Sequence, residues 1–109
     1  MNYKEKLLNP KWQKKRLEVL ERDSFTCQIC ASDTETLHVH HKSYKFGNEP
    51  WDYDLSNFTT LCFDCHMLEG NAKVELNEMI KNLQKDGIPL LHITQDFKHQ
   101  IYLKHNFNG

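Results

Sequence analysis

Two Cys-x2-Cys pairs constrain the fold of this 109-residue chain more than any other feature of its sequence. The first pair is Cys27 and Cys30, the second is Cys62 and Cys65, and together they contain all four cysteines. Each pair can present two sulfurs to one ion, and four thiolates suit a tetrahedral zinc ion. The interval between the pairs is longer than in a zinc ribbon or zinc finger, so an additional segment must be inserted there.

Disulfide bonds are the alternative use of these cysteines. They require an oxidising compartment, and residues 1–9 are polar and lack the apolar segment of a secretory signal. No apolar run approaches the length that crosses a membrane. We therefore expect a structural zinc ion and a soluble, cytoplasmic protein. A domain of this size has a small core, so a metal ion would add useful stability.

The segment between the cysteine pairs contains the dipeptide His40-His41, and residues 37–41 have the alternating pattern of a short strand. Alternation places Leu37, Val39 and His41 on one face and His38 and His40 on the other. Adjacent histidines therefore cannot share one role on one face. Taken alone they could be ordinary polar strand residues, but the cysteine pairs, Asn57 and His66 together favour a functional site.

In this order the residues resemble the HNH endonuclease family, in its zinc-stapled branch. The resemblance covers about residues 10–70, and its pieces are Cys27-x2-Cys30, Val39-His40-His41, Asn57, Thr60-Leu61-Cys62 and Cys65-His66. It implies an α+β fold: a small ββα-metal core of the His-Me finger type, an N-terminal helix and C-terminal helices. It also implies a metal-dependent enzyme of bacterial or phage type that hydrolyses DNA phosphodiester bonds.

The roles of family residues can be carried over to this chain. His41 takes the position of the general base, and a histidine near neutral pKa suits that task. Asn57 either orients the loop that bears His41 or adds a ligand oxygen. His40 and His66 take the positions of the catalytic metal ligands, and the further histidine of the histidine-rich members falls on Gly70.

Two protein ligands and several waters suit Mg²⁺ or Mn²⁺ as the catalytic ion. A histidine pair can also take Ni²⁺ or Zn²⁺. His38 shares the face of His40, and it is either a spare ligand or a residue that orients one.

We expect one domain over residues 1–109, with a core at about 10–70 and a helical C-terminal extension at about 71–105. Asn9 and Pro10 are a good cap and first residue for a helix that ends near Arg22. The remaining predictions are a loose arm at 1–9, a strand at 59–61, a helix at 63–68, a break at Gly70-Asn71, and helices at 72–85 and 90–103.

The net charge of −1 excludes a protein that coats nucleic acid through bulk charge alone. Positive charge is concentrated in residues 1–22, which hold seven Lys or Arg against three Glu, whereas residues 23–109 have a net charge of −5. These cations form either an ordinary solvated face or a phosphate-contacting one. The candidates for DNA contact are Lys14, Lys15, Arg22, Lys42 and Lys45.

Two other functions remain open from the sequence. The chain could be a non-catalytic, zinc-stapled module that binds DNA or a protein, although such a module needs none of His41, Asn57 and His66. RNA could be the substrate, since only the family resemblance favours DNA. The modest charge is also compatible with a protein partner, as in a phage packaging or restriction complex.

Overall fold

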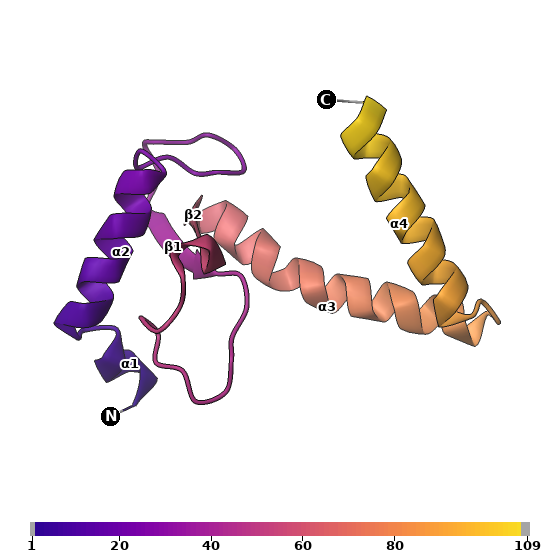
Figure 1. Ribbon diagram of the computed structural model, residues 1–109, viewed down its shortest axis with the longest axis horizontal. Coiled ribbons are helices and arrows are strands. Elements are labelled where there is room, and N and C mark those ends of the chain that lie inside the picture. Colours follow the sequence, from indigo (N-terminus) through magenta and orange to yellow (C-terminus); the bar gives the residue numbers. More distant parts are fainter. Residues whose placement is uncertain (1, 108–109) are drawn as a thin grey trace. The chain divides into compact units, whose positions relative to one another are not determined.

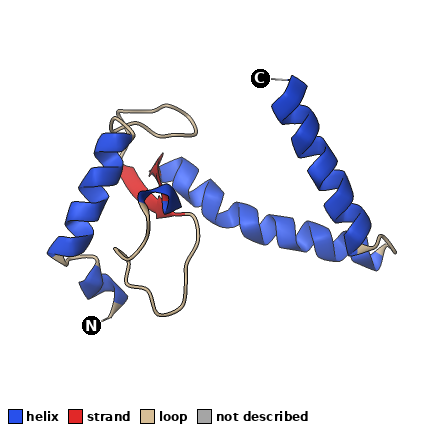
Figure 2. Cartoon of the chain, in the orientation of Figure 1, coloured by secondary structure: helices blue, strands red, loops and turns tan. Residues whose placement is uncertain are grey.

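The computed structural model describes residues 2–107 of the chain (Figure 1). The elements are, in order, α1 (Tyr3–Lys6), α2 (Pro10–Arg22), β1 (Leu37–His41), the 3₁₀ helix η1 (Leu55–Asn57), β2 (Phe58–Cys62), α3 (Phe63–Lys85) and α4 (Leu90–Phe107). A two-stranded sheet thus has helices before and after it in the chain, which confirms the α+β prediction (Figure 2). The chain divides into two compact units, Met1–Glu69 and Gly70–Gly109.

Helix α2 begins and ends where its local sequence signals predict. The Asn9 side chain caps it by accepting a hydrogen bond of 2.9 Å from the backbone N–H of Lys11, and Pro10 occupies the first turn. At the other end Ser24 adopts a φ of 55°, and the Phe25 N–H donates to the carbonyl of Leu20. This left-handed residue reverses the chain and directs it toward the first cysteine pair.

The two strands pair antiparallel, in a register that runs from Leu37 opposite Cys62 to His41 opposite Phe58. This register places the second cysteine pair next to the start of β1 and the His40-His41 dipeptide next to the start of β2. The strand predicted at 59–61 is therefore one residue longer at each end. The 3₁₀ helix η1 immediately precedes β2.

Two apolar clusters hold the first unit together. One consists of Trp12, Val19 and Phe58, against which partly buried residues pack: Leu7, Val39, Trp51, Tyr53 and Leu55. The other consists of Leu61 and three of the cysteines, so most of the candidate zinc ligands are themselves part of the core. Because α2 contacts both strands, the sheet has one face covered by this helix.

Two predictions about helices were wrong. The helix that begins at Phe63 runs without a break through Gly70-Asn71 to Lys85, because Gly70 adopts ordinary helical backbone geometry rather than a left-handed turn. Residues 1–9 are not simply a loose arm, because α1 forms behind an Asn2 cap. In the second unit α3 ends at Lys85, as predicted, shortly before Gly87 with a φ of 90°, and α4 continues to Phe107.

None of the helices among residues 2–107 combines the length and the apolar character required to cross a bilayer.

Candidate metal centre and histidine cluster

Four cysteines from separate parts of the first unit come together. Cys27 and Cys30 lie in the turn after α2, Cys62 ends β2, and Cys65 lies in the first turn of α3. All four Sγ atoms are within 4.8 Å of one another, and Cys30 and Cys62 are 3.7 Å apart. Sulfurs bound tetrahedrally at about 2.3 Å from zinc are about 3.8 Å apart. The donor set and its spacing therefore fit a structural zinc ion.

The surroundings of the sulfurs also favour a cation. Burial opposes ionisation of Cys27, but backbone N–H groups of Cys30, Cys62 and Ile29 lower its pKa to about 6. Burial and the neighbouring sulfurs raise the pKa of Cys65 to about 12. Four thiols this close cannot all ionise unless a positive charge lies between them, and a zinc ion would supply that charge.

A cluster of three histidines lies beside this centre. His38 and His40 occupy one face of β1. The centroid of the His66 ring, on α3, lies 5.1 Å from that of His38 and 5.3 Å from that of His40. Burial, with the charges of His38 and His40, lowers the pKa of His66. Since neutral imidazole is the form that binds metals, this shift keeps His66 ready to act as a ligand near neutral pH.

One nitrogen in this cluster lacks a protein partner. The Nε2 atom of His38 is buried and makes no hydrogen bond, and a buried polar atom of this kind is suited to a water or an ion. Among residues 2–107, however, only the cysteines bring three or more potential metal ligands within 4.8 Å of one another. A pair of histidine ligands completed by water molecules, such as His40 with His66, is smaller than such a group.

His41 points to the opposite face of β1 and is only 4% exposed. Its ring is stacked between the rings of Trp12 and Tyr44, with centroid separations of 5.2 Å and 4.8 Å. The ring of Phe58 meets it edge-on, with a centroid separation of 4.7 Å. Burial lowers its pKa; the hydrogen bond to Pro50 opposes that shift, and the charge of His40 adds to it. His41 is therefore neutral at pH 7.

The hydrogen bond between His41 and Pro50 fixes the tautomer of this ring. Nε2 lies 2.9 Å from the Pro50 carbonyl oxygen. Because a carbonyl oxygen can only accept, Nε2 carries the proton and Nδ1 has a free lone pair. A cavity of about 330 Å³ along β1 is lined by His38, His41 and His66, among others. His40 instead lines a separate cavity of about 310 Å³ with Lys42, Thr59 and Glu69.

Asn57 holds the chain that follows His41. Its side-chain amide donates to the Ser43 carbonyl at 2.9 Å and accepts from the Ser43 hydroxyl at 2.7 Å. Its own carbonyl accepts the backbone N–H of Lys42 at 2.8 Å. These three bonds connect η1 to the end of β1.

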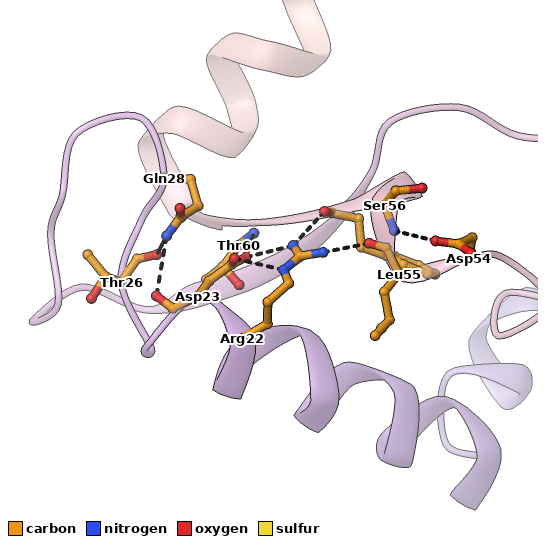
Figure 3. A network of polar contacts seen from close by, with 9 residues as sticks. Arg22, Asp23, Thr26, Gln28, Asp54, Leu55, Ser56 and Thr60 are labelled. Atoms are coloured by element: carbon orange, nitrogen blue, oxygen red, sulfur yellow. Dashed lines mark hydrogen bonds and ion pairs between the residues drawn. The ribbon is translucent and has the colours of Figure 1, made fainter.

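The candidate DNA contacts fall into two groups. Lys14, Lys42 and Lys45 are exposed, and Lys15 is half-buried. Arg22, in contrast, uses four of its five N–H bonds within the protein: two to the Asp23 carboxylate, one to the Leu55 carbonyl and one to the Phe58 carbonyl (Figure 3). The Asp23 carboxylate in turn accepts the backbone N–H of Thr60. Arg22 therefore connects the end of α2 to η1 and β2.

Sequence reasoning missed the residues that enclose His41. Pro50, nine residues later in the loop after β1, and Trp12, in α2, contact its ring, and Tyr53 adds an edge contact at 5.4 Å between ring centroids. The available signal was the number of aromatic residues in the loop after β1, which indicated packing but not against which side chain. Ser43 carried no signal at all.

Residues 27–72 match the HNH endonuclease family. The HNH segment contains both cysteine pairs, the His40-His41 dipeptide, Asn57 and His66, so the expected resemblance is confirmed over these residues. It suggests nuclease-type activity or another function related to nucleic acids. No curated protein and no solved structure matches the chain.

Proposed function

We propose that the chain is a metal-dependent HNH endonuclease that hydrolyses DNA phosphodiester bonds. The observation that carries the proposal is the state of His41: a neutral ring whose Nε2–H is fixed by Pro50, with Nδ1 free, in a cavity shared with His38 and His66. A general base needs a free lone pair and a pKa near or below the working pH. His41 meets both requirements.

In the proposed mechanism, Nδ1 of His41 accepts a proton from a water molecule. The resulting hydroxide attacks phosphorus, and the bond from phosphorus to the 3′ oxygen breaks. His40 and His66 are the residues that would hold the catalytic ion, with His38 as a neighbour. When bound, Mg²⁺ or Mn²⁺ (alternatively Ni²⁺ or Zn²⁺) would neutralise charge on the phosphate and stabilise the departing oxygen.

Asn57 acts in this proposal as an orienting residue rather than a ligand. Both ends of its amide are engaged with Ser43, directly after the segment that bears His41. A ligand oxygen would have to give up the hydrogen bond from the Ser43 hydroxyl. The bonds instead fix the position at which the chain leaves β1.

Lys14, Lys15, Lys42 and Lys45 remain the candidates for contact with DNA phosphates. Arg22 is better explained as a structural residue, because the protein already satisfies most of its donors. A protein partner, such as a packaging or restriction complex, would supply binding energy that this small set of cations lacks.

One alternative has its own supporting observation. A non-catalytic, zinc-stapled module that binds DNA or a protein is favoured by the burial of the His41 ring, which is only 4% exposed. In that case the histidines would be packing residues around the zinc-bound core.

Cleavage of supercoiled plasmid separates the two functions. The zinc-loaded chain would be incubated with Mg²⁺, Mn²⁺ or Ni²⁺, and compared with His41→Ala and with His92→Ala, which changes an exposed histidine of α4. Nicking by the wild type and by His92→Ala, with its loss in His41→Ala at unchanged zinc content, is the expected result. Equal nicking by His41→Ala would rule out His41 as the base. No nicking with any ion would favour the binding module.

A further inference from the structure

The tip of the loop between β1 and η1 carries an unusually exposed aromatic side chain. Phe46 has a relative exposure of 105%, the highest among the large hydrophobic side chains that the structure describes. It lies at the second position of a turn that is closed by a 3.1 Å hydrogen bond from the Asn48 N–H to the Lys45 carbonyl. Gly47, with a φ of 89°, supplies the left-handed third position that such a turn requires.

This tip is braced on both sides. The backbone N–H of Lys45 donates to the Tyr53 hydroxyl at 2.9 Å, and the Asn48 amide donates to the Asp52 carbonyl at 3.1 Å. The Glu49 N–H donates to the Asp52 carboxylate at 3.0 Å. The exposure of Phe46 is therefore a property of a hydrogen-bonded loop. A partner that buries this side chain would lose little conformational entropy in ordering the loop.

The same loop is attached to the proposed general base. Pro50, four residues after Phe46, accepts the hydrogen bond from His41, and Tyr44, two residues before it, stacks on the His41 ring. Whatever contacts Phe46 is thus held close to the catalytic cavity. A residue that binds the substrate so near His41 can determine where the scissile phosphate lies.

The charges near the tip favour a polyanion. Lys42 and Lys45 are exposed on this loop. The charge of Glu49, the nearest acid after the turn, is balanced by Lys6 at 2.7 Å. Asp52 keeps its charge, but its carboxylate is turned into the loop, where it accepts the backbone N–H of Glu49. An exposed aromatic ring directly after exposed lysines is the combination used by proteins that insert an apolar side chain between base steps from the minor groove.

We propose that Phe46 is a wedge that inserts between adjacent base pairs of duplex DNA and kinks it, while Lys42 and Lys45 hold the flanking phosphates. This inference rests on the proposed DNA nuclease function. It predicts a preference for sites that are easily unstacked, such as pyrimidine–purine steps, mismatches and nicks, without hydrogen-bonded reading of base edges. Phe46 would then be a positioning residue that selects deformable DNA.

The test measures base unstacking and bending separately from cleavage. A short duplex with 2-aminopurine at a TA step, and end labels for energy transfer, is titrated with the His40→Ala chain so that the DNA stays intact. This variant lacks a proposed metal ligand but keeps the contacts of His41 with the loop. Phe46→Ala and Phe46→Trp are added to this background. Leu8→Ala, which truncates another highly exposed apolar side chain of the same unit, is the control.

We expect the 2-aminopurine signal to rise and the duplex to bend with the parent chain, Leu8→Ala and Phe46→Trp. With Phe46→Ala both signals should be lost, and affinity should fall about tenfold to a hundredfold, as expected for removing one buried aromatic contact. In the chain that retains His40, Phe46→Ala should cleave intact duplex poorly but recover on DNA with a mismatch.

Two results would overturn the wedge. The first is that Phe46→Ala unstacks the duplex, bends it and binds it as well as the parent chain does. The exposed ring would then belong to a protein interface. The second is that Phe46→Ala cleaves intact duplex as fast as the wild type. This result would overturn the wedge but leave the nuclease proposal standing. If instead the DNA is unstacked and bent but the wild type never cleaves it, the nuclease proposal fails and the wedge remains.

Discussion

Replacing Arg22 by methionine tests whether this residue is structural or contacts DNA. The change retains an aliphatic side chain but removes four hydrogen bonds, which leaves the Leu55 and Phe58 carbonyls and the Asp23 carboxylate without these donors. The Asp23 side chain is only 8% exposed, so its charge would be left largely buried. The Asp23 pKa is lowered chiefly by its hydrogen bond with Arg22, which shows that the folded state favours the ionised pair.

The expected loss of stability follows from the strength of these bonds. Breaking a buried ion pair costs about 3–5 kcal/mol, and a hydrogen bond to a charged group contributes about 1.5–3 kcal/mol. Because the Arg22 side chain is 36% exposed, water can replace part of what is lost. We therefore expect Arg22→Met to lower the free energy of unfolding by about 3 kcal/mol, a large share of the stability of a small domain.

Urea unfolding of the zinc-loaded chain measures this loss. With a slope of about 2 kcal/mol per molar urea, the midpoint should fall by about 1.5 M. Lys14→Met, which changes an exposed residue of the same helix, should stay within about 0.5 kcal/mol of the wild type. In a double-mutant cycle with Asp23→Asn, a coupling energy of about 1 kcal/mol or more should remain. If Arg22→Met is as stable as Lys14→Met but binds DNA more weakly with a smaller salt dependence, Arg22 is a phosphate contact and our reasoning is wrong.

Four further predictions concern the metal centre and the candidate site. Ala31 has a φ of 65° in the first cysteine turn, so Ala31→Gly should raise the free energy of unfolding by about 1 kcal/mol. Ala72→Gly, inside α3, should lower it by about the same amount. Chemical denaturation measures both changes. Cys62→Ala should retain no zinc by metal analysis and lose its cooperative thermal transition, because structural zinc contributes about 10 kcal/mol or more. Because burial lowers the His41 pKa, the cleavage rate should stay level as pH falls to about 6.5 and decline only below it; a decline that begins above that pH, at constant zinc content, would contradict the lowered pKa of this base. Asn57→Ala should lower the cleavage rate and cost about 1–2 kcal/mol of stability, measured on the same samples, with zinc retained.

Local signals in the sequence were sufficient for several elements. The cap at Asn9 with Pro10 defined the start of α2, and the alternation over residues 37–41 gave β1 with its bounds and its two faces. The spacing of the cysteines predicted that they would meet, because each pair forms its own turn. These features depend on residues a few positions apart, and the chain between them has little influence.

Contacts between distant residues could not be predicted in the same way. Arg22 binds carbonyls 33 and 36 residues later, and backbone carbonyls leave no mark in the sequence. The burial of His41 depends on Trp12 and Pro50, which only the folded loop brings together. The predicted break at Gly70-Asn71 failed for a related reason. A glycine inside a helix costs only about 1 kcal/mol, so strong helix formers on both sides can outweigh it.

The adjacency of Cys65 and His66 affects how chelation experiments should be interpreted. Successive residues of a helix point about 100° apart, so Cys65 reaches the cysteine centre while His66 faces β1. A chelator that strips the cysteines of zinc would free the start of α3 to rotate, and would displace His66 even if Mg²⁺ were abundant. Inhibition by EDTA alone therefore does not identify a catalytic ion in this protein. Only restoration by Mg²⁺ or Mn²⁺ while zinc remains bound would identify one.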